Sequence, residues 1–297
     1  MMIKEALEEA ASALKEVSAT ARLDAELLLC KVTGQSRTGL IAAHYDYLSD
    51  ASLSNYRELV ARRRSFQPIA YLTGSKEFFG LEFIVNPAVL VPRPETELLV
   101  DAALREIDKR TGSIGILDLG TGSGCIAVSL AAELLKRRRA FQMTAIDRDP
   151  DALEVAKLNA RRHGVDDLIE FRRSDWFSEI PGGARFDVIL SNPPYVKRDA
   201  QDLSPELQFE PDGALYAEDG GLSCIEELIS KLDIYLGEGG FFCCEIGQGQ
   251  SQAVTEIITS RLSGSSLFES GTLLDLAGIE RVVYVRLLKR VDLNKIG

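Results

Sequence analysis

The chain has 297 residues, of which 45% are hydrophobic and 27% are charged, as expected of a globular protein with a sizeable core. Its net charge is −11 at pH 7, and its pI is about 4.9. This charge excludes the classes that bind nucleic acid or anionic membranes through a broad basic surface, and we expect no direct binding to either. The basic runs at 62–64 and 136–139 predict solvated helix ends, with a local basic patch as the alternative.

The cysteine and histidine content argues against a metal site. The five cysteines are scattered, none forms a Cys-x-x-Cys pair, and neither of the two histidines is close to one in sequence. An odd, scattered set of cysteines indicates a reducing compartment. The N-terminus is an acidic amphipathic segment rather than a signal peptide, and no apolar run approaches ~18 residues. We therefore expect a cytoplasmic protein, and a monomer.

The first 70 residues predict a small helical bundle, which we take as a substrate-recognition domain (1–70). Apolar residues recur every three or four positions over 3–18, which is typical of an amphipathic helix. A second helix is expected to have Asp24 as its N-cap and to end at Gly34, and a third is expected to begin near Ser52.

A linker with a β-hairpin is expected next, over residues 71–93. Phe78–Leu81 and Glu82–Val85 have the composition of two short strands around a glycine turn. Pro94 suits the first turn of a helix, and this helix opens the third region, residues 94–297.

From Ile114 onward, strand and helix patterns alternate, which predicts a doubly wound parallel sheet with right-handed crossovers. The seven strands are expected near 116–119, 143–147, 169–172, 187–190, 240–245, 266–270 and 282–288. Helices are expected near 124–135, 150–162 and 222–236. Because no long helix pattern separates the last two strands, we expect the final strand to be antiparallel. The predicted fold class is α/β, a seven-stranded Rossmann-like sheet.

A glycine-rich turn follows the first strand of this sheet. It consists of Gly120, Thr121, Gly122, Ser123 and Gly124. Glycines in such a turn let the backbone approach a ligand closely. The spacing differs from the G-x-G-x-x-G dinucleotide fingerprint, and no Lys-Ser/Thr follows as it would in a phosphate loop. Alone, this turn is equally consistent with a plain strand-to-helix connection.

Acidic and aromatic side chains follow the next two strands. Asp147 ends the second strand, where a carboxylate can accept both hydroxyls of a ribose; the alternative is a helix N-cap, a role that Asp149 can also fill. Asp175 and Trp176 follow the third strand. Asp175 can accept from the adenine amine and Trp176 can cover the ring, with ordinary packing as the alternative for the tryptophan. Together with the glycine turn, these residues describe S-adenosylmethionine bound across a class I methyltransferase sheet.

The fourth strand ends in Asn192-Pro193-Pro194-Tyr195. Two prolines remove two backbone donors and fix φ, so a stiff extended loop begins there. Such a loop suits a planar nitrogen, which can be adenine N6, cytosine N4, guanine N2 or a glutamine side-chain N5. A nitrogen of this kind attacks poorly because its lone pair is delocalised into a ring or a carbonyl. Hydrogen bonds to the Asn192 side-chain oxygen and the Pro193 carbonyl would aim that lone pair at a sulfonium methyl, while Tyr195 packs on the planar group. We predict Asn192, Pro193 and Tyr195 as catalytic and all four residues as the substrate-binding loop, with a structural turn as the alternative.

Taken with these sites, further segments resemble the bacterial peptide chain release factor glutamine methyltransferases of the HemK/PrmC group. The resemblance covers nearly the whole length. Its additional segments are Pro68–Gly74, Val91–Glu97, Phe209–Pro211 with Ala214 and Leu215, Glu245–Gly247 and Asp275–Arg281. DNA adenine methyltransferases share the Asn-Pro-Pro-Tyr loop but not this set.

The resemblance implies an enzyme of translation termination that uses S-adenosyl-L-methionine. It would methylate the side-chain nitrogen (N5) of the glutamine in the Gly-Gly-Gln motif of class 1 peptide chain release factors. In the family, the glycine turn, the acidic strand end, the tryptophan and the asparagine contact the methyl donor, which implies Gly120–Gly124, Asp147, Trp176 and Asn192 here. The helical domain and the linker would help to hold the release factor.

Three other functions share parts of this pattern. A sister enzyme that methylates a ribosomal-protein glutamine would have the same loop and donor site and would differ in its recognition domain. A nucleic-acid amino-group methyltransferase would carry a basic face, which the acidic charge disfavours. An inactive binding protein would have lost Asn192 or the glycine turn, and both are present.

Overall fold

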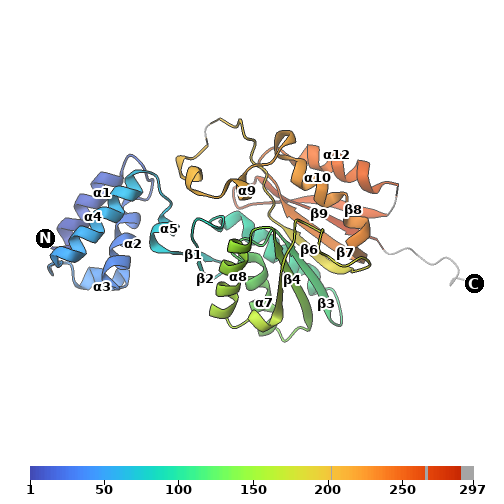
Figure 1. Cartoon of the computed structure of the whole chain (residues 1–297), viewed down its shortest axis with the longest axis horizontal. Coiled ribbons are helices and arrows are strands. Elements are labelled where there is room, and N and C mark those ends of the chain that lie inside the picture. Colours follow the sequence, from blue (N-terminus) through green and yellow to red (C-terminus); the bar gives the residue numbers. More distant parts are fainter. Residues whose placement is uncertain (202, 265–266, 289–297) are drawn as a thin grey trace, which may run out of the picture. The chain divides into compact units, whose positions relative to one another are not determined.

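The computed structural model describes residues 1–201, 203–264 and 267–288, and its chain divides into two compact units (Figure 1). The first unit comprises Met1–Ser75 with Val85–Pro87 and Leu203–Phe209. The second contains the hairpin residues Lys76–Ile84 and the sheet. Within the described ranges, no helix combines the length and apolar character needed to cross a membrane.

The first unit is a helical bundle, as predicted. Its helices are α1 (Ile3–Leu14), α2 (Ala21–Thr33), α3 (Arg37–Ala42), α4 (Asp50–Arg64) and α5 (Ile69–Thr73). Leucines and alanines form most of its core, together with Tyr56, whose hydroxyl donates to the Ala25 carbonyl at 3.0 Å. Gly34 ends α2 with a φ of 70°, the left-handed conformation that favours glycine. The short helix α3 was not predicted, although the Ser36 side chain caps it.

The bundle differs from the prediction at Asp24 and at the arginine run. α2 begins at Ala21, so Asp24 lies inside the helix instead of capping it. Its carboxylate is buried and accepts from Nε of Arg63 at 2.7 Å, and Nη2 of Arg63 donates to Glu206 at 2.7 Å. Arg63 is therefore a buried, paired cation and not part of a solvated helix end, because a buried charge requires such partners. α1 is also shorter than predicted and ends at Leu14.

The predicted hairpin is present, formed by β1 (Ser75–Phe78) and β2 (Leu81–Ile84). β1 begins and ends three residues earlier than expected, because Phe79 and Gly80 form the turn with φ values of 52° and 73°. Asn159, in α8, holds this hairpin against the rest of the second unit. The amide is buried; its oxygen accepts from the Ile84 N–H at 2.7 Å, and its nitrogen donates to the Ile84 carbonyl at 3.0 Å.

The seven-stranded sheet has the order β5-β4-β3-β6-β7-β9-β8. Its strands are β3 (Ile114–Leu119), β4 (Phe141–Asp147), β5 (Ile169–Arg173), β6 (Phe186–Ser191), β7 (Leu236–Glu245), β8 (Phe268–Leu274) and β9 (Glu280–Leu287). Strands β3 to β7 are mutually parallel, and β9 runs antiparallel to both of its neighbours. The predicted sheet and its antiparallel final strand are confirmed. The predicted strand at 266–270 starts outside the described residues, and β8 itself begins at Phe268.

Helices cover both faces of this sheet (Figure 1). The longer ones are α6 (Glu97–Ile107), α7 (Cys125–Lys136), α8 (Pro150–Arg162), α10 (Ser223–Ile229) and α12 (Ser251–Leu262). Shorter elements are η1 (Pro94–Thr96), η2 (Asp166–Leu168), η3 (Pro205–Phe209), α9 (Asp212–Leu215), η4 (Asp219–Gly221) and α11 (Leu232–Tyr235). Successive strand residues point to opposite faces, so Ile116 lies in the core with α6 and α7, and Leu117 in the core with α10 and α12.

In the second half of the chain, one predicted helix needs correction and one helix was missed. The predicted helix at 222–236 is split into α10 and α11. The Ser230 hydroxyl donates to the Glu227 carbonyl at 2.7 Å where α10 ends, a local bond that competes with helix continuation. α12 was not predicted.

Gly124 sets the distance between α7 and α8. It precedes the first turn of α7 with a φ of 79°, and a Cβ on it would lie 3.1 Å from the Ala156 Cβ. Only glycine combines that backbone conformation with so close an approach of the two helices.

Substitution Gly124→Ala is expected to lower the free energy of unfolding by about 3 kcal/mol, because left-handed strain adds to overpacking. Urea denaturation measures the loss. Gly164→Ala is the matched control, since Gly164 has a φ of 66° but no atom within 4 Å of the added Cβ. It should lose only about 1 kcal/mol, and equal losses at both positions would contradict the packing role.

Candidate active site

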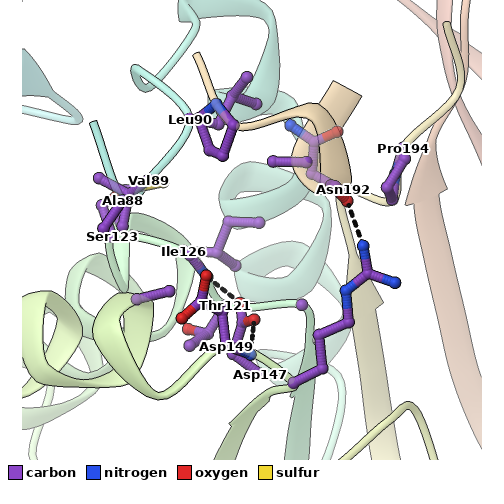
Figure 2. Close-up of a pocket in the computed structure, with 18 of the residues that line it drawn as sticks. Ala88, Val89, Leu90, Thr121, Ser123, Ile126, Asp147, Asp149, Asn192 and Pro194 are labelled. Carbon is purple, nitrogen blue, oxygen red and sulfur yellow. Dashed lines mark hydrogen bonds between the residues drawn. The ribbon is translucent and has the colours of Figure 1, made fainter. Parts of the chain in front are cut away.

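A pocket lies at the carboxyl ends of the central strands (Figure 2). Nine residues predicted from the sequence line it: Gly120, Thr121, Gly122, Ser123, Asp147, Asp175, Trp176, Asn192 and Pro194. Three other predicted site residues, Gly124, Pro193 and Tyr195, do not line it. The structure thus brings together residues from four separate strand ends.

The glycine turn is held by the acidic end of the next strand. Gly120, Gly122 and Gly124 have φ values of 73°, 54° and 79°, which explains why glycine recurs at every second position. The Gly122 N–H donates to Oδ2 of Asp147 at 2.8 Å. Burial raises the pKa of Asp147, although this hydrogen bond opposes the shift.

Asp147 is not the cap of the following helix. Asp149 fills that role, because its side chain accepts from the Asp151 N–H at 2.8 Å at the start of α8. The other oxygen of Asp147, Oδ1, accepts from the Asp149 N–H at 3.0 Å. The carboxylate of Asp147 lines the pocket and is not used for capping.

Trp176 forms an aromatic wall against the glycine turn. A Cβ built on Gly120 would lie 3.4 Å from Cζ3 of the indole ring. Trp176 has a φ of 46°, a conformation that is strained for a non-glycine residue. The Ser174 hydroxyl donates to its carbonyl at 2.6 Å and stabilises this turn. Asp175, between them, is exposed.

Asp118 is a buried acid at this turn that the sequence did not single out. It is fully buried near the end of β3, where Oδ2 accepts from the Thr121 hydroxyl at 2.7 Å. Its Oδ1 has no hydrogen-bond partner in the described part of the chain. Burial raises the pKa of Asp118 to about 7. Asp118 does not itself line the pocket.

Two loops that follow the hairpin and the Asn-Pro-Pro-Tyr segment also line the pocket. The first loop contributes Ala88, Val89, Leu90 and Pro92. The second segment contributes Gly213 and Ala214 from α9, with Pro211 and Tyr216 on either side of that helix. Glu210 joins the two loops. Its buried carboxylate accepts from the Val91 N–H at 3.0 Å and pairs with Arg93. Phe209–Pro211 was a segment of the resemblance with no role assigned to it. This contact shows that Glu210 holds the two pocket segments together.

Asn192 is oriented by a chain of buried hydrogen bonds. Its Nδ2 donates to Oγ1 of Thr96 at 3.1 Å, and the Thr96 hydroxyl donates to Oε2 of Glu245 at 2.6 Å. The Tyr195 hydroxyl donates to Oε1 of Glu245 at 2.8 Å, so this ring points to Glu245. Among the described residues, no group donates to the Asn192 side-chain oxygen.

Solved structures place the fold among methyltransferases. The hMettl16 catalytic domain superposes with a TM-score of 0.55 at 18% identity, covering 79% of this chain and 83% of that chain. The human methyltransferase 10 domain containing protein gives a TM-score of 0.50 at 20% identity, covering 72% of this chain and 90% of that chain. At these identities the likeness shows the fold, which is that of a Rossmann-like methyltransferase.

Sequence relatives narrow this class to one family. Family models for the PrmC N-terminal domain and the methyltransferase small domain match residues 5–74 and 95–222. The release factor glutamine methyltransferase of Burkholderia pseudomallei is 42% identical over 276 residues, 91% of this chain and 94% of the relative. The release factor glutamine methyltransferase of Escherichia coli is 41% identical, covering 84% of this chain and 87% of the relative. The chain belongs to the PrmC family of release factor glutamine methyltransferases, which confirms the resemblance.

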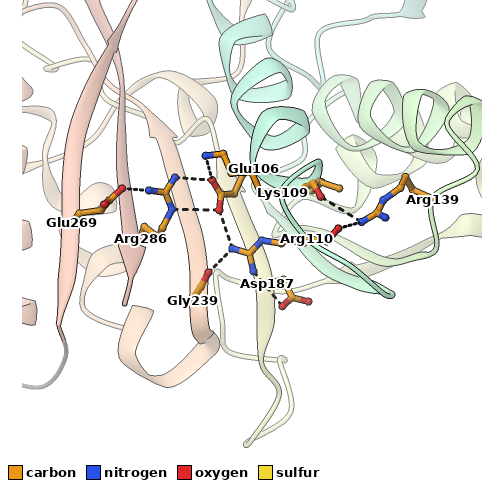
Figure 3. Close-up of polar contacts among 9 residues, drawn as sticks. Glu106, Lys109, Arg110, Arg139, Asp187, Gly239, Glu269 and Arg286 are labelled. Atoms are coloured by element: carbon orange, nitrogen blue, oxygen red, sulfur yellow. Dashed lines mark hydrogen bonds and ion pairs between the residues drawn. The ribbon is translucent and has the colours of Figure 1, made fainter. Parts of the chain in front are cut away.

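The helix that follows Thr96 is anchored at its far end by an ion network (Figure 3). Glu106, in the last turn of α6, accepts from Nε and Nη2 of Arg286 on β9 at 3.3 and 2.7 Å. Arg110 also donates to Glu106, at 3.3 Å. Nη2 of Arg139 donates to the carbonyl of Ile107, the last residue of α6, at 3.4 Å and to the Arg110 carbonyl at 2.8 Å. The predicted solvated run at 136–139 therefore ends in a residue that caps another helix.

This network predicts a pH-dependent stability. Burial opposes ionisation of Glu106, but hydrogen bonds from Arg286 and Lys109 prevail and hold its pKa below the usual value. Its contribution is therefore present above about pH 4.5 and lost as the pH falls through the folded-state pKa. Glu106→Gln should lose about 1–3 kcal/mol at pH 7 and show a flatter acid dependence.

Urea denaturation between pH 3 and pH 7 measures this effect. Glu238→Gln, at an exposed position on β7, is the control and should follow the wild-type curve. Parallel curves for wild type and Glu106→Gln would contradict the assignment.

Proposed function

We propose that this chain binds S-adenosyl-L-methionine in the pocket and transfers its methyl group to a glutamine of class 1 peptide chain release factors. The acceptor is the side-chain N5 of the glutamine in the Gly-Gly-Gln motif. The observation that carries the proposal is the Asn192 oxygen, which is left free to accept at a pocket that also contains the glycine turn, Asp147 and Trp176. The relatives, named as release factor glutamine methyltransferases, supply the substrate.

The residues of the pocket fit this methyl donor. Asp147 offers a carboxylate for the ribose hydroxyls, Trp176 a ring for the adenine face, and the exposed Asp175 an acceptor for the adenine amine. When bound, the donor supplies an electrophilic methyl group on a positively charged sulfur.

The loop at Asn192 makes the glutamine nitrogen reactive. Its two N–H groups donate to the Asn192 side-chain oxygen and the Pro193 carbonyl, which fixes the lone pair toward the methyl carbon. The nitrogen–carbon bond forms as the carbon–sulfur bond breaks, and the electron pair stays on sulfur. The same two acceptors stabilise the positive charge on nitrogen, whose proton then passes to solvent without a strong base.

The three regions are proposed to divide the work. Residues 1–70 and the hairpin linker at 71–93 hold the release factor, and residues 94–297 carry the donor and the reaction. The family match at 5–74 supports a dedicated N-terminal module. The enzyme is proposed to act in the cytoplasm as a monomer.

Incubation with labelled donor, purified release factors, a ribosomal protein fraction and RNA tests the substrate. Mass mapping should place the label on the glutamine of Gly-Gly-Gln. Asn192→Ala should lower turnover at least ~100-fold with unchanged urea denaturation, because a transition-state acceptor is lost. Label in a ribosomal protein would indicate the sister activity, label in RNA would overturn the protein substrate, and unchanged turnover would remove Asn192 from the mechanism.

Asp147→Ala and Asp147→Asn test the donor site separately. Both should weaken donor binding by about 1–3 kcal/mol, because a charge-assisted hydrogen bond to the ribose is lost. Titration calorimetry measures the affinity. Asp166→Ala, at an exposed acid in η2, is the control and should bind the donor like the wild type. Equal affinity in all four proteins would refute the ribose role.

A further inference from the structure

A buried carboxylate lies beside the catalytic loop. It belongs to the Glu245–Gly247 segment of the resemblance but was not predicted as a site residue. Glu245 is the last residue of β7, next to β6 in the sheet, and only 1% of it is exposed. Hydroxyl groups occupy both of its oxygens, from Thr96 at 2.6 Å and from Tyr195 at 2.8 Å. Thr96 is equally buried, in the turn η1 that precedes α6.

The donor and acceptor roles in this chain follow from chemistry. An ionised carboxylate only accepts, so the single hydroxyl proton of Thr96 is committed to Glu245. The Thr96 oxygen can then only accept from Asn192, which places the amide NH₂ of Asn192 on Thr96. The amide oxygen must therefore lie on the opposite side. If the Asn192 amide were flipped, its NH₂ group would face the N–H groups of the substrate, and no hydrogen bond could form between them.

We propose that Thr96 and Glu245 are positioning residues, which fix the Asn192 amide with its oxygen available to the substrate nitrogen. The inference rests on the proposed function for its catalytic consequence and on this network for its geometry. Thr96 acts on Asn192 directly, and Glu245 acts through Thr96. Neither needs to contact the reacting atoms.

The backbone of the same loop is held by a different residue. Nε2 of Gln250 donates to the Tyr195 carbonyl at 3.2 Å, and Oε1 of Gln250 accepts from the Gly247 N–H at 2.8 Å. Loss of the Thr96 hydroxyl therefore leaves these loop contacts in place. The expected consequence is a freely rotating Asn192 amide on an otherwise intact loop.

Thr96→Val and Thr96→Ser form a matched pair, because valine keeps the shape and removes the hydroxyl, whereas serine keeps the hydroxyl. We expect Thr96→Val to lower kcat 10- to 100-fold, with the KM for the release factor and the Kd for the donor changed less than threefold. Thr96→Ser should restore kcat to within about threefold of the wild type. Ser129→Ala controls for loss of a buried hydroxyl, since Ser129 has no hydrogen-bond partner among the described residues.

Side-chain amide NMR of the ligand-free enzyme provides a readout that does not require activity. The Asn192 NH₂ protons, assigned by their loss in Asn192→Asp, should exchange slowly in wild type and Thr96→Ser and at least tenfold faster in Thr96→Val. Glu245→Gln is the second variant, for the case that Thr96→Val does not fold. An amide there can donate to Thr96 and release the Thr96 proton, so the same faster exchange and lower kcat are expected.

The outcomes separate the two proposals. Equal kcat and equal exchange in Thr96→Val and wild type would overturn the positioning role. Equal loss in Thr96→Val and Thr96→Ser would overturn it as well, because shape and not the hydroxyl would then matter. A wild-type enzyme that methylates none of the substrates would contradict the proposed function, while the exchange rates would still decide the orientation of Asn192.

Discussion

Parallel hydrogen bonding of β3 to its two neighbours is the constraint on which the site depends. The register pairs Leu119 with Ile146 of β4 and with Ser191 of β6. The next residue after each of these three strand positions is Gly120, Asp147 or Asn192. A slip of one residue would move a loop by about 3.3 Å and turn its side chains to the other face. Residues that are far apart in the sequence therefore lie close together, because the strand register fixes the positions of the strand ends.

This constraint explains what the sequence could and could not predict. Residues that end parallel strands must share one edge, so Asp147 and Asn192 could be placed together from local patterns alone. Thr96 and Glu245 are 149 residues apart, and their hydrogen bond depends on how α6 packs on the sheet. No local pattern encodes that packing, so neither residue was predicted as part of the site.

Two errors had different origins. Asp24 has the residue type of an N-cap and precedes the apolar run that predicted the helix, but in the structure it lies inside α2 and pairs with the buried Arg63. α12 carries Val254, Ile258 and Leu262 at a spacing of four, a signal of a helix with one buried face that was present in the sequence and was not used. The first error could be corrected only with the tertiary structure, whereas the second could have been avoided from the sequence.

The buried acids of the second unit fall into two groups. Glu106 and Glu210 pair with arginines and hold secondary structure elements or loops together. Asp118 and Glu245 accept from hydroxyl groups, and burial raises the pKa of both. Acids without a cation are costly to bury. Among the described residues of the second unit, these two acids lie near the carboxyl ends of β3 and β7, at the edge of the sheet that carries the pocket.

The single tryptophan of the chain is the aromatic wall of the pocket. Indole emission responds to the polarity and stacking of its immediate surroundings, and Trp176 is the sole source of that emission. Its fluorescence is therefore an intrinsic optical probe of whether the site is filled. The protein can be followed through a catalytic cycle without any attached dye.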